Sequence, residues 1–200
     1  MRITAFSPRV RQRGVAALEA VLILPVAIAL VFACVEMYQF YRAAALIDRV
    51  AFTVANGVAM QHNLYDKNQC TKSDDICVYS TMAHDLFQPL DYDSGGGLVI
   101  SAYAATDPDI NGNVVWKDAA EWSKAYKSAS SSSSNPVSRL SDKSLFPPAK
   151  VGDTIIVAEV FYSYDPFIMT SRLWTSLGGT KELYSRFFFR PRFEELRTLL

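Results

Sequence analysis

The stretch VAALEAVLILPVAIALVFACV, residues 15–35, decides how this chain is organised. It contains a single charged residue, Glu19. A helix of about 20 apolar residues crosses the roughly 30 Å hydrocarbon core of a bilayer. A soluble helix rarely stays apolar on every face over so many turns, and the core of a secretory signal peptide is shorter, at about 7–15 residues. The stretch therefore predicts one transmembrane helix.

The charges that precede this run predict its orientation. They are four arginines with no acidic residue among them: Arg2, Arg9, Arg11 and Arg13. Basic flanks stay in the cytoplasm, so the N-terminus is expected there and everything after about Phe40 in the periplasm or outside the cell. The whole chain has twenty basic and twenty acidic residues, which offers no electrostatic basis for binding nucleic acid.

The helix is predicted to continue beyond the membrane, so that it covers residues 15–60. Apolar residues recur at steps of three and four, the pattern of an amphipathic helix. They are Ala43, Ala44, Leu46, Ile47, Val50, Ala51, Val54, Ala55, Val58 and Ala59. Pro25 is expected to bend the helix because proline removes a backbone donor, and membrane helices tolerate this.

Glu19 is the anomaly in the apolar run, and two interpretations are open. An ionised acid at the bilayer centre costs on the order of 2.5–3.5 kcal/mol, and less near the surface. The side chain could snorkel to the cytoplasmic headgroups. Alternatively, a cut after Gly14 would give Val15 a free ammonium, and the ammonium of a neighbouring subunit could pair with Glu19 as helices pack.

The residues around Gly14 resemble a type IV prepilin processing site. A short basic leader, residues 1–14, ends in glycine, Glu19 is the fifth residue after the expected cut, and an apolar run follows. Type IVa pilins and type II secretion pseudopilins have Phe just after the cut, and major Flp pilins have Tyr after the Glu. This chain has Val15 and Ala20 instead, and it resembles the minor pseudopilins of the tight-adherence (Tad) system.

Further stretches carry the likeness to the TadE and TadF families, nearer TadF. They are residues 18–25 (LEAVLILP), 45–52 (ALIDRVAF) with 63–65 (NLY), 151–166 (VGDTIIVAEVFYSYDP) and 189–192 (FRPR). The resemblance implies a non-catalytic subunit without a cofactor, cleaved after Gly14 by a prepilin peptidase. Its implied place is the inner membrane, or the pilus outside the cell. Its implied partners are TadE- and TadG-like minor pseudopilins and the Flp major pilin.

The cysteines fit a protein with an oxidised outer part. Cys34 ends the membrane run and is interpreted as a small apolar packing residue. Cys70 and Cys77 lie beyond the membrane, where an oxidising compartment favours a disulfide. A zinc site is the alternative, but six intervening residues do not match the usual Cys-x2–4-Cys spacing and four good ligands are lacking.

The part beyond the helix is predicted to be α+β, with residues 61–97 as a polar connecting segment and 98–200 as a small antiparallel sheet domain with short helices. A helix is expected over 78–87, ended by Pro89, and a glycine-rich turn over 93–97. The strand pattern at 98–105 is expected to pair with 114–116 across a turn. Residues 119–129 suggest a short helix, and the serines at 128–134 suggest a loop.

The strongest strand signal lies at residues 153–164, followed by a loop or helical excursion at 167–177, a turn at Gly178-Gly179 and a last strand at 183–189. Both faces of 153–164 are largely apolar, which predicts a central strand covered on each side. Leu140, Leu145 and Phe146 are expected to pack at the sheet edge. Glu159 is the exception in the central strand. It is either buried and paired with Arg186 or Arg190, or exposed at an edge.

Catalytic patterns are missing from the sequence. The only histidines are His62 and His84, and no Gly-x-Ser-x-Gly is present. Acid pairs such as Asp74-Asp75 are typical of solvated faces. A non-catalytic protein without a small-molecule substrate is therefore expected. The alternatives are a signal-anchored periplasmic binding or enzymatic domain, and a type II secretion pseudopilin.

Overall fold

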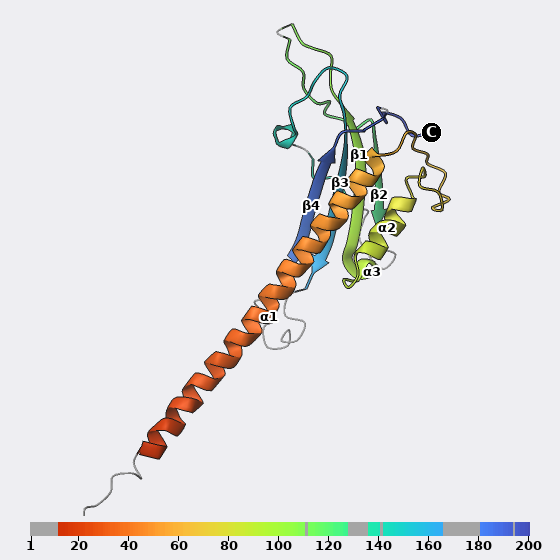
Figure 1. The fold of residues 1–200 in the computed structure, drawn as a ribbon. Coiled ribbons are helices and arrows are strands. Elements are labelled where there is room, and N and C mark those ends of the chain that lie inside the picture. Colours follow the sequence, from red (N-terminus) through yellow and green to blue (C-terminus); the bar gives the residue numbers. More distant parts are fainter. Residues whose placement is uncertain (1–11, 111, 128–135, 141, 166–180, 194) are drawn as a thin grey trace, which may run out of the picture. The chain divides into compact units, whose positions relative to one another are not determined.

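The structure is a computed structural model that describes residues 12–110, 112–127, 136–140, 142–165, 181–193 and 195–200. The chain divides into two compact units, Met1–Tyr41 and Arg42–Leu200. The first unit contains the beginning of helix α1 (Gln12–Ala59), which continues into the second. The described residues of the second unit also form two short α-helices, a 3-10 helix and four strands (Figure 1). The expected α+β architecture is confirmed, and α1 covers the predicted helix to within a few residues.

In the first unit, α1 exposes apolar side chains on all sides. Leu18, Ile23 and Leu30 are each more than 60% exposed, and no side chain from Leu18 to Val35 is buried. Pro25 lies inside the helix, which continues on both sides of it. The described residues of this unit thus offer no core for these side chains.

In the second unit, the same helix buries the predicted stripe. The side chains that are no more than 2% exposed are Ala43, Ile47, Val50, Ala51, Val54, Ala55, Val58 and Ala59. The spacing of three and four residues places them on one side of the helix. Arg42, Asp48 and Arg49 lie off the stripe and are exposed. The amphipathic pattern therefore predicted this half of α1 correctly.

The four strands form one antiparallel sheet in the order β2-β1-β3-β4. The central strands are β1 (Gly96–Ala104) and β3 (Thr154–Tyr164), and the edge strands are β2 (Trp122–Lys127) and β4 (Lys181–Phe189). All of β1 and all of β3 except Ser163 are buried. The prediction of a central strand at 153–164, covered on both faces, is confirmed, as is the last strand.

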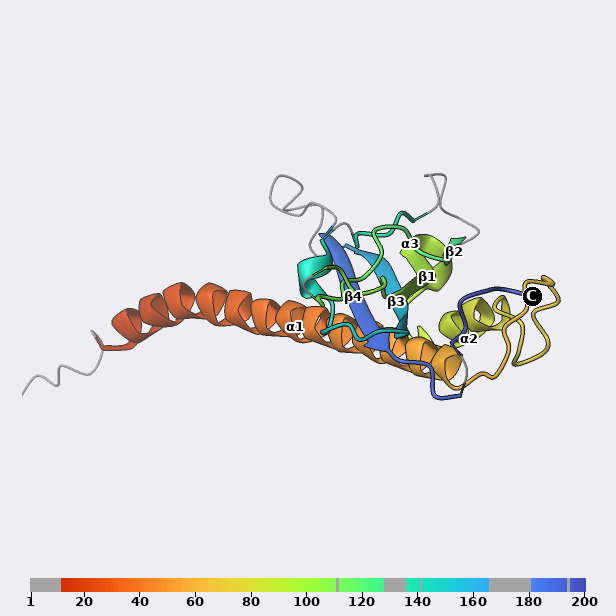
Figure 2. The same cartoon turned by 90° about the horizontal axis from the view of Figure 1, so that it is seen from above.

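The two faces of the sheet have different covers. On one face, Phe52 of α1 contacts Phe187 and Phe189 of β4 at ring-centroid distances of 5.6 and 5.3 Å. On the other face, coil residues and the 3-10 helix η2 (Lys143–Leu145) cover a second core (Figure 2). That core consists of Tyr103, Ala105, Trp116, Leu140, Phe146, Ile155 and Val157. Leu140 and Phe146 thus cover a sheet face rather than its edge, while Leu145 is 54% exposed.

Two predictions between β1 and β3 are wrong. Residues 119–129 were expected to be helical, but Trp122–Lys127 is strand β2 and pairs with Gly97–Ala102. Trp122 and Tyr126 share a face in a helix and also in a strand, so their spacing does not separate the two. The expected partner strand at 114–116 contributes only one bridge, Ala105 to Trp116.

The segment 61–97 is more than a polar connector. It contains α2 (Val78–Leu86), close to the helix expected at 78–87, and the one-turn helix α3 (Tyr92–Gly95). Leu64, Ile76 and Phe87 are buried core residues. Gly96 belongs to β1 rather than to a turn. A Cβ at this position would lie 2.3 Å from the Tyr92 ring, so the close approach of that ring requires glycine.

The C-terminal tail ties the end of α1 to the rest of the second unit. The Arg192 amide donates to the Ala59 carbonyl, and Leu200 exchanges backbone hydrogen bonds with Leu64 and Asp66. The Trp122 indole donates to the Leu196 carbonyl at 2.8 Å. Predictions for residues 1–11, 128–134 and 167–179 lie outside the described residues.

Candidate functional site

Glu19 lies in the exposed apolar part of α1. The residues one helical turn away, Ala16, Leu22 and Ile23, carry no positive charge, and neither does the side chain of Val15. Leu18, Leu22 and Ile23 around it are between 64% and 65% exposed. The chain itself therefore supplies no cation beside this carboxylate within the helix.

The expected cleavage position, Gly14–Val15, falls in the first turn of α1. The side chains of residues 12–16 lie outside the described part of the structure. Because α1 begins at Gln12, residues 12–14 and the positions after the expected cut follow one another in a single helix. The leader residues before Gln12 are not described.

Within two turns beyond the apolar run, aromatic side chains appear on the surface of α1. Tyr38 and Tyr41 are 66% and 63% exposed, and the Phe40 ring lies edge-on to Tyr41 at 5.8 Å. Aromatic side chains of this kind concentrate where a membrane meets water. Cys34, at the end of the run, is a free and exposed cysteine rather than one packed against the chain. Among the described residues, α1 is the one helix long and apolar enough to cross a membrane.

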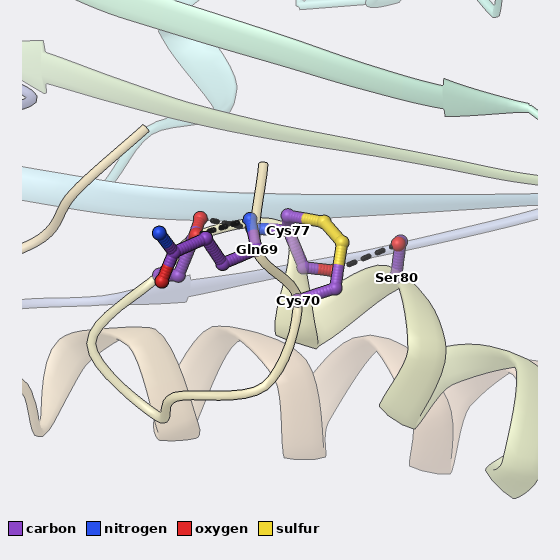
Figure 3. Close-up of a disulfide and its surroundings, with 5 residues drawn as sticks. Gln69, Cys70, Cys77 and Ser80 are labelled. Atoms are coloured by element: carbon purple, nitrogen blue, oxygen red, sulfur yellow. Dashed lines mark hydrogen bonds between the residues drawn. A yellow bond between two sulfur atoms is a disulfide. The ribbon is translucent and has the colours of Figure 1, made fainter. Parts of the chain in front are cut away.

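A disulfide joins Cys70 to Cys77, as predicted (Figure 3). It closes the loop that leads into α2, and the Ser80 hydroxyl donates to the Cys77 carbonyl at 2.8 Å. The loop also contacts α1, because the Tyr79 hydroxyl lies 3.1 Å from the Gly57 carbonyl and 3.2 Å from the Ser73 carbonyl. Burial raises the pKa of Tyr79 to about 12, so the phenol stays a proton donor.

Asp75 organises the same loop, a role that the sequence did not reveal. Its carboxylate is 2% exposed and accepts hydrogen bonds from the backbone amides of Gln69, at 2.9 Å, and Cys77, at 3.2 Å. Burial by itself would raise the pKa of Asp75, but these backbone donors hold the pKa below its ordinary value. Asp75 is therefore a structural anion, not the solvated acid that the pair Asp74-Asp75 suggested.

Glu159 is fully buried in β3, on the face covered by coil. Its Oε1 atom accepts a 2.7 Å hydrogen bond from the Tyr184 hydroxyl and a 2.9 Å bond from the Arg139 amide. Within the described residues, Oε2 has no hydrogen-bond partner. Burial and the hydrogen bond to Glu159 raise the pKa of Tyr184. Glu159 thus holds the coil at Arg139 against the sheet through the hydrogen bond from the Arg139 amide.

The expected arginine partners of Glu159 are engaged elsewhere. Arg186 lies opposite Glu159 in the strand register, but its guanidinium is over the Phe188 ring, 5.7 Å from the centroid. Arg190 pairs with Asp153 at 2.9 Å. The alternative of an exposed edge glutamate is wrong, because β3 is central. The sequence did not identify Tyr184 as a partner of Glu159. The available signal was that Tyr184 lies in the last strand, on the same face of the sheet as Glu159.

The described surface offers little for chemistry. Two hollows along the C-terminal tail, of about 260 and 240 Å³, are smaller than typical ligand pockets. Within the described ranges, no group of three or more His, Cys, Asp or Glu side chains could hold a metal ion. His62 is exposed and stacks on Phe193 at 4.2 Å, while His84 lies 3.5 Å from both Asp85 and Asp93.

Comparisons with known proteins found no match to this chain among protein-family models, curated proteins or solved structures.

Proposed function

We propose that this chain is a minor pseudopilin of a Tad/Flp type IVb pilus, cut after Gly14 by a prepilin peptidase and active in pilus initiation or in the tip complex. In this proposal α1 crosses the inner membrane once, with the leader in the cytoplasm and the second unit in the periplasm. Assembly into the pilus would carry the second unit outside the cell. The protein would act through its contacts and not through catalysis.

The observation that carries the proposal is Glu19 in the exposed apolar part of α1. A lipid-facing helix can hold a carboxylate at lower cost when a cation on another chain lies at the same depth. The cut after Gly14 would create such a cation, the ammonium of Val15, on every mature copy. The tyrosines at 38 and 41 agree with a membrane boundary just beyond the apolar run.

The second unit fits a protein that works outside the cytoplasm. The disulfide between Cys70 and Cys77 is typical of oxidising compartments. The C-terminal tail and the coil at Arg139 are both hydrogen-bonded to the sheet, so the unit would present a firm surface to partners. In the proposal these partners are the TadE- and TadG-like minor pseudopilins and the Flp major pilin.

The test is a comparison of Glu19→Ala with Leu22→Ala, a matched truncation one turn further along the same exposed helix. Interhelical polar contacts in membranes contribute about 1 kcal/mol, roughly a fivefold change in affinity. We expect Glu19→Ala to insert normally and to recover several-fold less of the partner pseudopilins in pull-downs from solubilised membranes. Leu22→Ala should recover them as the unchanged chain does. Equal recovery by both variants would refute the role of Glu19.

A further inference from the structure

The loop between α1 and α2 is closed twice. The disulfide between Cys70 and Cys77 joins its two sides covalently, with the Cα atoms 4.8 Å apart (Figure 3). The carboxylate of Asp75 joins the same two sides without a covalent bond. Its Oδ2 atom accepts a hydrogen bond from the Gln69 amide at 2.9 Å, and Oδ1 accepts one from the Cys77 amide at 3.2 Å. Because Gln69 directly precedes Cys70, one carboxylate spans the gap that the disulfide spans.

The backbone around Asp75 is anchored without the help of the two cysteines. The Tyr65 amide donates to the Asp74 carbonyl at 2.8 Å, and the Ile76 amide donates to the Tyr65 carbonyl at 2.9 Å. The side chain of Ile76 is fully buried in the core. Backbone pairing and core packing therefore hold the carboxylate on its own side of the loop. From there it can bind the opposite side before any disulfide exists.

The closed loop needs such a hydrogen-bonded link because its backbone is not one that the chain adopts freely. Asn68 and Cys70 have φ angles of 54° and 47°, in the left-handed region. Asparagine tolerates this conformation, but it is unfavourable for cysteine because of its Cβ atom. Closing a loop also costs chain entropy. A reduced loop therefore stays open unless the hydrogen bonds of Asp75 offset both costs.

Asp75 is suited to this because it is charged and shielded from water. It is 2% exposed, and hydrogen bonds to a charged acceptor are stronger than those between neutral groups. Burial alone would raise the pKa of Asp75, but four backbone amides of the loop outweigh burial and hold the pKa below its ordinary value. The side chain is thus ionised at neutral pH, in the form that accepts both hydrogen bonds.

Disulfide formation in this chain has to be selective because there are three cysteines. Cys34 is free and exposed, so it can react with a small oxidant, with another chain, or with either of the other two cysteines. A loop that Asp75 has already closed places the thiols of Cys70 and Cys77 next to each other. Groups held in this way react as if they were highly concentrated, which favours their own pairing over the alternatives.

We propose that Asp75 directs the oxidation of this chain, by closing the reduced loop and so selecting Cys77 as the partner of Cys70. The thiolate of one cysteine attacks a disulfide oxidant, which forms a mixed disulfide and releases one oxidant thiol. The thiolate of the other cysteine attacks the protein sulfur of the mixed disulfide and displaces the second oxidant thiol. The two cysteines lose two protons and two electrons, and the oxidant takes both. The inference does not depend on cleavage after Gly14.

The test compares Asp75→Asn with Asp74→Asn, which removes the same charge from the neighbouring residue. The full chain is solubilised, reduced and mixed with glutathione disulfide, and samples are quenched by alkylation and mapped by mass. Asparagine keeps only one acceptor oxygen, so one hydrogen bond is lost. We expect Asp75→Asn to form the Cys70–Cys77 bond at least about tenfold more slowly and to accumulate mixed disulfides and Cys34-linked dimers. Asp74→Asn should oxidise like the unchanged chain. Equal rates in the two variants would overturn the proposal.

Two controls separate positioning of the cysteines from other effects of the substitution. In denaturant no loop is preformed, so Asp75→Asn and the unchanged chain should oxidise at the same rate. A tenfold difference there would overturn the proposal, because the substitution would then act without the loop. The second control is a chain with Cys70→Ser and Cys77→Ser. Its amides at residues 69 and 77 should stay protected from hydrogen exchange, and adding Asp75→Asn should remove the protection. Free exchange before that addition would show that Asp75 does not close the loop by itself.

Discussion

Along α1, the residues before Arg42 and those after it use the same kinds of apolar side chain in opposite ways. Leu22 and Leu30 are 65% and 62% exposed, whereas Val50 and Val58 are fully buried. Before Arg42 the apolar residues surround the helix, and after it they form one stripe with charged residues opposite. A single helix thus matches two environments, and the change in pattern marks the passage from a lipid-compatible surface to a protein core.

The largest expected effect comes from a charge in the buried stripe. Val54→Asp would place an unpaired carboxylate in a fully buried position and should destabilise the second unit by more than about 4 kcal/mol. Thermal unfolding of the detergent-solubilised chain measures this loss. Ala45→Asp, at an exposed position of the same helix, should leave the midpoint nearly unchanged. Equal losses in the two variants would show that the stripe is not the core of this unit.

The same substitution in the first half of α1 should fail differently. Ile28→Asp places an acid near the middle of the apolar run, and we expect it to weaken membrane insertion by about 2.5–3.5 kcal/mol. Alkaline extraction of membranes should then release much of the variant, while Ile28→Val stays with the pellet. The melting of the second unit should not change. If Ile28→Asp lowered the melting point and left insertion intact, it would contradict the claim that the first half of α1 serves insertion and the second half serves the protein core.

The disulfide loop contacts α1 in its second half, through the hydrogen bond from Tyr79 to Gly57. Replacing both Cys70 and Cys77 by serine should cost about 2–3 kcal/mol of stability, because the loop that they close is short. Chemical denaturation of the variant, and of the unchanged chain with its disulfide formed, gives this difference. Membrane insertion should be the same in both. An unchanged denaturation midpoint would mean that the loop is held by Asp75 and Tyr79 without the covalent link.

Asp75 should give the smallest effect, visible in the pH dependence of stability. Its pKa in the folded protein lies below its ordinary value of 3.8, so its contribution is complete above that value. The contribution is lost as the pH falls through the lower folded pKa. Denaturant midpoints measured from pH 6 downward should therefore drop less steeply for Asp75→Asn than for the unchanged chain. Parallel pH profiles would contradict the assigned role of the carboxylate.

Most of the fold could be predicted because its main elements have strong periodicity. The apolar run, the stripe at 43–59 and the two-sided apolar strand at 154–164 each have one pattern that few alternatives share. The helix predicted around residues 122–127 was wrong because the spacing of Trp122 and Tyr126 fits a helix and a strand equally well. Pairing with β1 makes this segment a strand. Gly96 was predicted to lie in a turn. A glycine is needed there because the Tyr92 ring packs against it, and the sequence does not show such a packing contact.

The polar residues of the second unit show the same limit. The sequence identified Glu159 as an unusual residue, yet it pointed to an arginine partner. The coil that folds back over β3 supplies the Arg139 amide instead, and no sequence pattern places a backbone donor there. The role of Asp75 was hidden for the same reason, since its partners are backbone amides of its own loop.

The central claim is that Glu19 is matched by an ammonium that cleavage creates on a neighbouring chain. The most direct measurement is the intact mass of the full chain purified from the membranes of cells with and without a prepilin peptidase. The account predicts a chain that starts at Val15 when the peptidase is present, and the uncut chain when it is absent. A chain that keeps residues 1–14 in both cells would contradict it, because the ammonium at Val15 would then never form.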